Sequence, residues 1–447
     1  MKYVIIIADG GADKPIDELG GRTPFEAART PHMDELTRLG RVGTAVTTPP
    51  GYAAGSDVCS MCLLGYDPRT YHTGRAPLEA AALGLDLRPA DWIFRVNLVT
   101  VGAEGTPDDG LMLDHSAGAI SNAEARELVT GLMEFWRRHE PALCAELALT
   151  PGVSYRNILV DSSGNHTGGR TYGGMTTAPP HEIPRRPWRE HAPAAQAGSA
   201  SAAGAAVLNR LMSLSAEYLP AHPVNAARAA RGQRVANMVW IWGQGTRPAM
   251  PLFQERFGLR GAMITSVDLL AGIAALIGWD RLDVPGLTSY HDTDYAAQGR
   301  ATCDAIDSYD LVCSHVESPD EASHQGDWKT KVAAIEAIDQ QVLGPVMRRL
   351  SQFGDPAVDR DAEGWRLLYL PDHFTLVSTR KHDPTPVPFA MGGAWVRSAV
   401  QRSYGEASAA LSDLRVDPGD DLMEYFLRGG QANVPKTLRH APGAGHP

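Results

Sequence analysis

The sequence predicts an α/β fold with a mainly parallel sheet, helices on both of its faces, and a smaller inserted α+β domain. Short apolar runs at 3–7, 311–316 and 365–370 are typical of strands buried on both faces. Helix-length segments separate the later runs, and strands that alternate with helices favour a parallel sheet. The pattern changes between residues 85 and 234, which indicates an insertion.

The N-terminal strand at 3–7 ends at Ala8-Asp9-Gly10-Gly11, so Asp9 is expected at the carboxyl end of a buried strand. Open α/β sheets bind their ligands at this edge, although an Asp before glycines is by itself an ordinary turn. A helix is predicted to begin in the segment 30–36, and a second strand follows at 42–46. A loop rich in Pro and Gly then leads to Ser56.

The inserted domain is expected to span residues 85–234, which leaves 1–84 and 235–447 for the main domain. Within the insertion, 94–99 is predicted to be a strand and 123–138 a helix. The Ala/Gly/Ser-rich run 193–206 is expected to be a mobile surface segment or, equally, a helix.

Three further expectations concern the C-terminal half. Residues 235–242 are predicted to form a core strand that ends near Arg247, and the apolar segment 263–277 is predicted to be a helix. The segment 380–388 is expected to be irregular because it is rich in Pro.

Composition narrows the function classes. A chain of 447 residues with 43% hydrophobic residues can bury a large core, and a net charge of -11 argues against nucleic-acid binding. Five irregularly spaced Cys favour a reducing compartment. We see no apolar run long enough to span a bilayer and no cleavable leader, so we expect a cytoplasmic protein without a membrane partner. Nothing in the sequence indicates an oligomeric state.

Ser56 is the candidate nucleophile. It follows Gly55 and precedes Asp57 and an apolar, helix-like segment, a pattern that by itself is typical of a helix N-cap. The two interpretations are compatible, because the N-terminus of a helix also favours a phosphoryl anion.

A set of carboxylates and imidazoles indicates a divalent-metal centre. Asp320 and His324 are spaced to share one face of a helix, while Asp372 and His373 follow Pro371 into a loop. Each pair alone is more often a cap or a turn. Their common position near strand ends reverses those odds, and a donor set without thiolates suits Mn²⁺, Zn²⁺ or a similar ion. The predicted chemistry is metal-assisted phosphoryl transfer through a phosphoserine. The full predicted set is Asp9, Ser56, Asp320, His324, Asp372, His373 and His382.

The spaced motifs resemble a known family. In order they are Asp-Gly, then Gly-Ser-Asp with a later Leu-Leu-Gly-Tyr-Asp-Pro, then Gly-Arg-x-Pro-Leu-Glu-Ala, then Pro-Asp-Glu-Ala-x-His-x-Gly-Asp, then Pro-Asp-His and a later His. This set resembles the archaeal-type cofactor-independent (2,3-bisphosphoglycerate-independent) phosphoglycerate mutases of the alkaline phosphatase superfamily. The resemblance implies a metal-binding phosphatase-like domain interrupted by a substrate domain.

The resemblance also implies an activity and a ligand set. Ser56 would carry the phosphoryl group of a small phosphorylated substrate between 2- and 3-phosphoglycerate, as in glycolysis and gluconeogenesis. Two divalent ions are implied, most often Mn²⁺, with Zn²⁺, Co²⁺ or Mg²⁺ as alternatives. Asp9, Ser56, Asp372 and His373 would bind one ion, and Asp320, His324 and His382 the other. His115 is similar in context to a substrate-domain histidine and is the candidate general acid/base. The candidate partners of the substrate charges are Arg156, Arg247 and Lys331.

Several residues depart from the family pattern. Where archaeal relatives commonly have Lys before Ala-Pro-Asp-Glu, this chain has Glu317, and an arginine common in the segment 115–120 is absent. The segments 153–156 and 179–183 instead resemble a bacterial branch sometimes proposed to be homoserine kinases. A homoserine kinase-like phosphotransferase and a phosphomonoester hydrolase are therefore the alternatives. Cys59 and Cys62 form a C-x-x-C whose expected role is packing and not redox chemistry.

Overall fold

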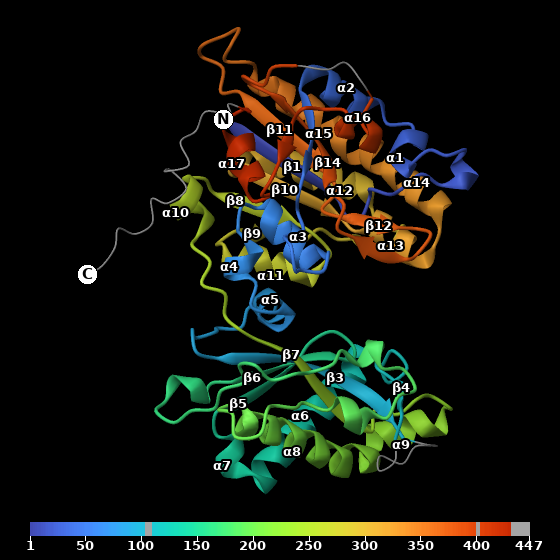
Figure 1. Ribbon diagram of the computed structural model, residues 1–447, viewed down its shortest axis with the longest axis vertical. Helices are drawn as coiled ribbons and strands as arrows, with labels where there is room; N and C mark the ends of the chain where they lie inside the picture. Colours follow the sequence, from blue (N-terminus) through green and yellow to red (C-terminus); the bar gives the residue numbers. More distant parts are fainter. Residues whose placement is uncertain (103–109, 399–402, 431–447) are drawn as a thin grey trace. The chain divides into compact units, whose positions relative to one another are not determined.

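The computed structural model describes residues 1–102, 110–398 and 403–430 (Figure 1). The chain forms two compact units. One combines Met1–His72 with Met250–Pro447, and the other is the single stretch Thr73–Ala249.

An eight-stranded sheet organises the first unit, with the order β15-β2-β14-β11-β1-β10-β8-β9. Strand β1 (Lys2–Ala8) lies between β10 (Leu311–Val316) and β11 (Trp365–Leu370) and pairs in parallel with both. Only β14 (Val387–Gly393) runs antiparallel to its neighbours β11 and β2 among the strands that the structure describes in this sheet. The mainly parallel α/β fold is therefore confirmed. The remaining strands are β2 (Arg41–Ala45), β8 (Gly261–Ile264), β9 (Asp280–Arg281) and β15 (Arg415–Val416), with a separate hairpin of β12 (Phe374–Leu376) and β13 (Lys381–Asp383).

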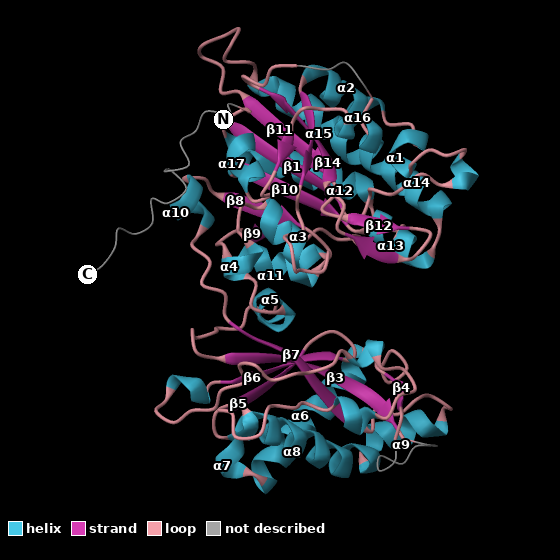
Figure 2. Ribbon diagram, in the orientation of Figure 1, coloured by secondary structure: helices cyan, strands magenta, loops and turns pink. Residues whose placement is uncertain are grey.

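Helices cover the sheet on both faces (Figure 2). Consecutive residues from Val4 to Ala8 are all buried, which requires cover on both sides because alternate side chains point to opposite faces. The helices of this unit are α1 (Pro24–Ala27), α2 (Pro31–Leu39), α3 (Ser56–Leu63), α4 (Pro68–Tyr71), α10 (Phe253–Phe257), α11 (Asp268–Leu276), α12 (Tyr295–Ser308), α13 (Ser318–Gln325), α14 (Trp328–Ile338), α15 (Gly344–Leu350), α16 (Glu406–Ala410) and α17 (Asp421–Leu427).

The second unit is an antiparallel sheet covered by helices. Its long central strand β3 (Trp92–Val101) pairs with β4 (Met112–Asp114), β6 (Arg156–Asp161) and β7 (Met238–Thr246), and β6 also pairs with β5 (Leu147–Pro151). The helices are α5 (Arg75–Ala82), α6 (Asn122–His139), α7 (Pro141–Cys144), α8 (Ala202–Tyr218) and α9 (Pro223–Ala230). This unit extends beyond the expected 85–234 at both ends because α5 and β7 pack with β3.

Two local expectations are wrong, and a third holds in part. The segment 263–277 begins with the last residues of β8 before α11 starts, since an apolar run does not by itself distinguish a strand from a helix. The Pro-rich segment 380–388 contains β13 and the start of β14, because Pro384 and Pro386 fall in the connection between these strands. Helix α8 begins at Ala202, so only the last part of the Ala-rich run 193–206 is helical.

Candidate active site

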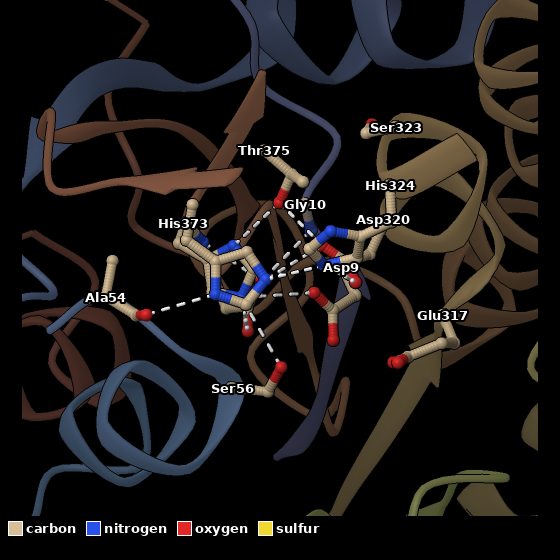
Figure 3. A network of polar contacts seen from close by, with 12 residues as sticks. Asp9, Gly10, Ala54, Ser56, Glu317, Asp320, Ser323, His324, His373 and Thr375 are labelled. Carbon is tan, nitrogen blue, oxygen red and sulfur yellow. Dashed lines mark hydrogen bonds and ion pairs between the residues drawn. The ribbon is translucent and has the colours of Figure 1, made fainter. Parts of the chain in front are cut away.

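The predicted metal ligands of the first unit meet at one edge of its sheet (Figure 3). Asp9 follows β1, Asp320 and His324 lie on α13 after β10, and Asp372 and His373 follow β11. The parallel register places Ala8 opposite Val316 and Ile7 opposite Leu370, so the three strands end at the same level. The position expected from open α/β sheets is therefore the one found.

Ser56 is the first residue of α3, and Gly55 occupies the N-cap position. The expectation that Ser56 itself is the N-cap is therefore wrong. Its hydroxyl instead lies 3.4 Å from Nε2 of His373. The helix start thus directs the hydroxyl into the cluster.

His373 lies at the centre of one ligand set. Its Nε2 is 3.4 Å from Oδ1 of Asp9 and 3.4 Å from Oδ2 of Asp372, and all three side chains are fully buried. Oδ1 of Asp372 accepts from the N–H groups of Gly10 and His373, whereas Oδ2 of Asp372 and Oδ1 of Asp9 have no hydrogen-bond partner. Buried carboxylate oxygens without partners are costly, and a cation bound between them removes that cost.

The second set contains Asp320, His324 and His382. Asp320 contacts Nε2 of His324 through Oδ2 at 3.2 Å, one helical turn away, and Nε2 of His382 through Oδ1 at 3.4 Å. The two Nε2 atoms are 2.9 Å apart. A carboxylate and two imidazoles that face one point are a typical donor set for a divalent ion.

Hydrogen bonds on the outer side of each ring fix the imidazole orientation. Nδ1 of His324 faces the carbonyl of Arg380, and Nδ1 of His382 faces the carbonyl of Ala54, both at 3.0 Å. A carbonyl only accepts, so each Nδ1 must donate, and each Nε2 is left to bind a metal.

Thr375 performs the same role for His373 and links the two sets. Its hydroxyl donates to Oδ1 of Asp320 at 2.5 Å and therefore accepts from Nδ1 of His373, 3.1 Å away. Thr375 was not among the predicted site residues, because a threonine in a short strand carries no recognisable signal.

The acidic groups and the imidazoles at this edge of the sheet have pKa values shifted in opposite directions. Burial, together with Asp9, raises the pKa of Asp372 to about 7. Burial acts in the same direction on Asp320, but hydrogen bonds with His324 and His382 hold the pKa of Asp320 well below its ordinary value. The hydrogen bond with Asp320 raises the pKa of His324 to about 9, and burial lowers the pKa of His373. Such opposed shifts are typical of functional sites.

Two groups that were not among the predicted site residues lie beside Asp9. His315, at the end of β10, has Nε2 2.8 Å from Oδ2 of Asp9. Glu317 follows it, and burial and the carboxylate of Asp9 raise the pKa of Glu317 well above its ordinary value. A histidine at the end of an otherwise apolar strand was the signal that could have identified this pair.

Lys331, a candidate substrate partner, is fully buried in the first unit. Its ammonium group donates to Oδ2 of Asp13 at 2.9 Å and to the carbonyls of Ala12 and Thr375. These three acceptors use its three protons, so the expected role of Lys331 in binding substrate charge is not supported.

The other candidate substrate residues lie in the second unit. His115 packs edge-on against Tyr155 and His181, and its carbonyl accepts from Asn97. Arg156, exposed at the start of β6, has its guanidinium 5.3 Å from the ring centre of Tyr155. Arg247, also exposed, donates to the carbonyl of Leu87.

A half-buried arginine with aromatic neighbours lies in the same unit. The guanidinium of Arg95 stacks 4.3 Å from the ring of Trp242 and lies 3.1 Å from Glu79. Trp242 in turn contacts His181. Neither Arg95 nor Trp242 was among the predicted site residues.

The C-x-x-C pair is buried in α3. Burial raises the pKa of Cys59 to about 12 and the pKa of Cys62 well above its ordinary value, which favours the packing role.

Within the described parts of the chain, no helix is both long and apolar enough to cross a bilayer.

Comparisons with known proteins agree with the geometry. Residues 37–225 match a family model described as 2,3-bisphosphoglycerate-independent phosphoglycerate mutase. The chain is 41% identical over 429 residues to the enzyme of that name from Methanothrix thermoacetophila, covering 96% of this chain and 100% of that one. It is 41% identical over 428 residues to a probable enzyme of the same name from Geobacter sulfurreducens, with coverage of 96% and 100%.

Solved structures share the fold. A protein from Pyrococcus horikoshii superposes with a TM-score of 0.76 at 28% identity, covering 96% of this chain and 97% of that one. A cofactor-independent phosphoglycerate mutase from Thermoplasma acidophilum gives a TM-score of 0.63 at 25% identity, covering 96% and 100%.

Proposed function

Because the chain belongs to the 2,3-bisphosphoglycerate-independent phosphoglycerate mutase family, we propose that it interconverts 2- and 3-phosphoglycerate through a phosphoserine at Ser56. The observation that carries this proposal is the position of the Ser56 hydroxyl, 3.4 Å from Nε2 of His373. Beside it lie carboxylate oxygens of Asp9 and Asp372 that have no hydrogen-bond partner. A hydroxyl at the entrance of a cation site is the arrangement that phosphoryl transfer to serine requires.

Two divalent ions fit the donor atoms. We propose that Asp9, Ser56, Asp372 and His373 bind one, and that Asp320, His324 and His382 bind the other. Bound there, they supply positive charge that lowers the pKa of the serine hydroxyl and neutralises the phosphoryl oxygens. We propose Mn²⁺, with Zn²⁺, Co²⁺ or Mg²⁺ as alternatives.

The chain's own groups then perform the transfer. Oγ of Ser56 loses its proton and attacks phosphorus as the ester bond to one glycerate oxygen breaks. The first turn of α3 offers backbone N–H groups to the phosphoryl oxygens. In the return step the other glycerate hydroxyl loses its proton and attacks the phosphoserine, and Oγ of Ser56 is released. For the inserted unit we propose that His115 is a general acid/base and that Arg156 and Arg247 bind substrate charge.

We propose the cytoplasm as the place of action. All five cysteines lie in the described part of the chain and are free, as is usual in a reducing compartment.

The test is ³¹P NMR of the purified protein with Mn²⁺ and 3-phosphoglycerate, without nucleotide. We expect a new 2-phosphoglycerate signal. Inorganic phosphate alone would identify a hydrolase, and turnover that requires ATP and homoserine would identify a kinase.

A pair of serine variants tests the nucleophile. Ser56→Ala should abolish turnover. Ser60→Ala is the matched control, because Ser60 is buried one turn further along the same helix and its hydroxyl has no hydrogen-bond partner. Equal activity in the two variants would refute the role of Ser56.

A further inference from the structure

Beyond the two proposed ion sites, a third group of buried donor atoms surrounds the other oxygen of Asp9. Asp9, His315 and Glu317 each offer one ligand atom, and these atoms all lie within 4.8 Å of one another. Asp9 and His315 come from the ends of adjacent strands, β1 and β10, and Glu317 follows β10 directly. The parallel register of the sheet therefore assembles the group.

Asp9 presents a different oxygen to each side. Oδ1 lies 3.4 Å from His373 and belongs to the site beside Ser56. Oδ2 lies 2.8 Å from Nε2 of His315. One carboxylate can therefore bridge two cations, and the proposed function uses only the Oδ1 side.

Glu317 completes the group and is not satisfied by the protein. Its Oε2 atom is buried, has no hydrogen-bond partner, and lies 3.7 Å from Nε2 of His315. Figure 3 shows its carboxylate directed toward Asp9. Two buried carboxylates so close together require a cation or a shared proton between them.

The imidazole of His315 is held in an orientation suited to a ligand. Its Nδ1 lies 3.0 Å from the hydroxyl of Thr265, which also accepts from the N–H of Val267. A hydroxyl oxygen has two lone pairs, so it can accept from Nδ1–H as well and leave Nε2 free toward Asp9 and Glu317.

We propose that Asp9, His315 and Glu317 form a third divalent-cation site, which shares Asp9 with the site beside Ser56. Two carboxylates, one imidazole and no thiolate favour Mg²⁺ or Mn²⁺. A cation there neutralises Glu317 and adds positive charge behind Asp9, on the side opposite His373.

The test counts bound ions. Metal-free full-length protein is dialysed to equilibrium against increasing Mn²⁺, and the bound metal per chain is measured by mass spectrometry. Glu317→Gln should bind one ion fewer than the unchanged protein at saturation. Glu363→Gln is the matched control, because Glu363 is an exposed partner of the N-terminal amine, and it should bind the full number. Circular dichroism and a thermal melt confirm that each variant is folded.

A second variant tests the orientation of His315. Thr265→Val removes the hydroxyl beside Nδ1 and should weaken only one class of Mn²⁺ site, by roughly 10- to 100-fold. The proposal is overturned if Glu317→Gln binds as many ions as the unchanged protein, because Glu317 would then not be a ligand. It is also overturned if the unchanged protein binds only two. These counts do not depend on turnover, so a failed mutase assay would refute the proposed function and leave the ion count to decide this site.

Discussion

Removal of the Lys331 ammonium should destabilise the protein strongly and leave substrate affinity unchanged. Lys331 and Asp13 form a fully buried ion pair at 2.9 Å, and Lys331 also bonds to the carbonyls of Ala12 and Thr375. Burial lowers the pKa of Lys331 more than Asp13 raises it. Burying the charged ammonium is therefore unfavourable, and its ion pair and hydrogen bonds offset that cost. The informative variant is Lys331→Met, which keeps the length of the side chain.

The magnitude follows from what remains around Asp13. Breaking a buried ion pair by removing one partner typically costs about 3–5 kcal/mol. Asp13 keeps backbone N–H donors from Lys14 and Val377, so we expect the lower end, about 3 kcal/mol. For a unit of this size that corresponds to a fall in Tm of roughly 6–12 °C.

Differential scanning calorimetry measures the fall, and the double variant Asp13→Asn/Lys331→Met is the control. It removes both charges, so it should be more stable than Lys331→Met alone. A Lys331→Met protein with unchanged Tm and a raised KM for phosphoglycerate would refute the buried pair and restore Lys331 as a substrate contact.

Three further predictions concern the site, the inserted unit and the metal. Gly10→Ala should reduce turnover by roughly 100-fold, because the new Cβ would lie 2.5 Å from Oδ1 of Asp320 and displace that ligand. Gly20→Ala is the control, because Gly20 also has a positive φ but faces open space. It should lower the free energy of unfolding by only about 1 kcal/mol and keep activity. Burial raises the pKa of Asp161, but hydrogen bonds from Arg170 and Tyr172 lower it by a larger amount. The net pKa of Asp161 therefore lies below the ordinary 3.8. The stabilisation from ionised Asp161 is therefore complete above pH 3.8 and lost as pH falls through the folded-state pKa, so urea unfolding should show the gap between the unchanged protein and Asp161→Asn closing in acid; a constant gap would contradict this. Chelation with EDTA should abolish turnover and lower Tm, both recovering with added Mn²⁺, whereas an unchanged melt would show that no ion stabilises the site.

Much of the fold could be predicted where the sequence pattern is local. The strands at 311–316 and 365–370 have the predicted bounds, because short, mainly apolar runs are typical of strands buried on both faces. The antiparallel β14 was missed because the prolines at and before its start suggest an irregular segment. Where that segment ends and the strand begins depends on pairing with the distant strands β2 and β11.

The ligand set was predictable for a related reason. Asp9, Asp320 and Asp372 all follow strands, and residues at strand ends converge whenever the strands are parallel neighbours. The state of Lys331 was not predictable, because its acceptor Asp13 is 318 positions away in the sequence. Glu317 was noticed only as a departure from the family, because its proximity to Asp9 results from the register of β1 and β10.

The central position of β1 dictates the order in which the chain can fold. Its neighbours β10 and β11 begin at Leu311 and Trp365, so during synthesis the apolar N-terminal strand leaves the ribosome long before either partner exists. The unit Thr73–Ala249 is one continuous stretch with its own core and can be complete by then. Closing the main sheet requires contacts of very high sequence separation, which is slow and leaves an unpaired hydrophobic strand exposed in the nascent chain. In the sheet, β1 therefore stays without its two neighbours until β10 and β11 have been made.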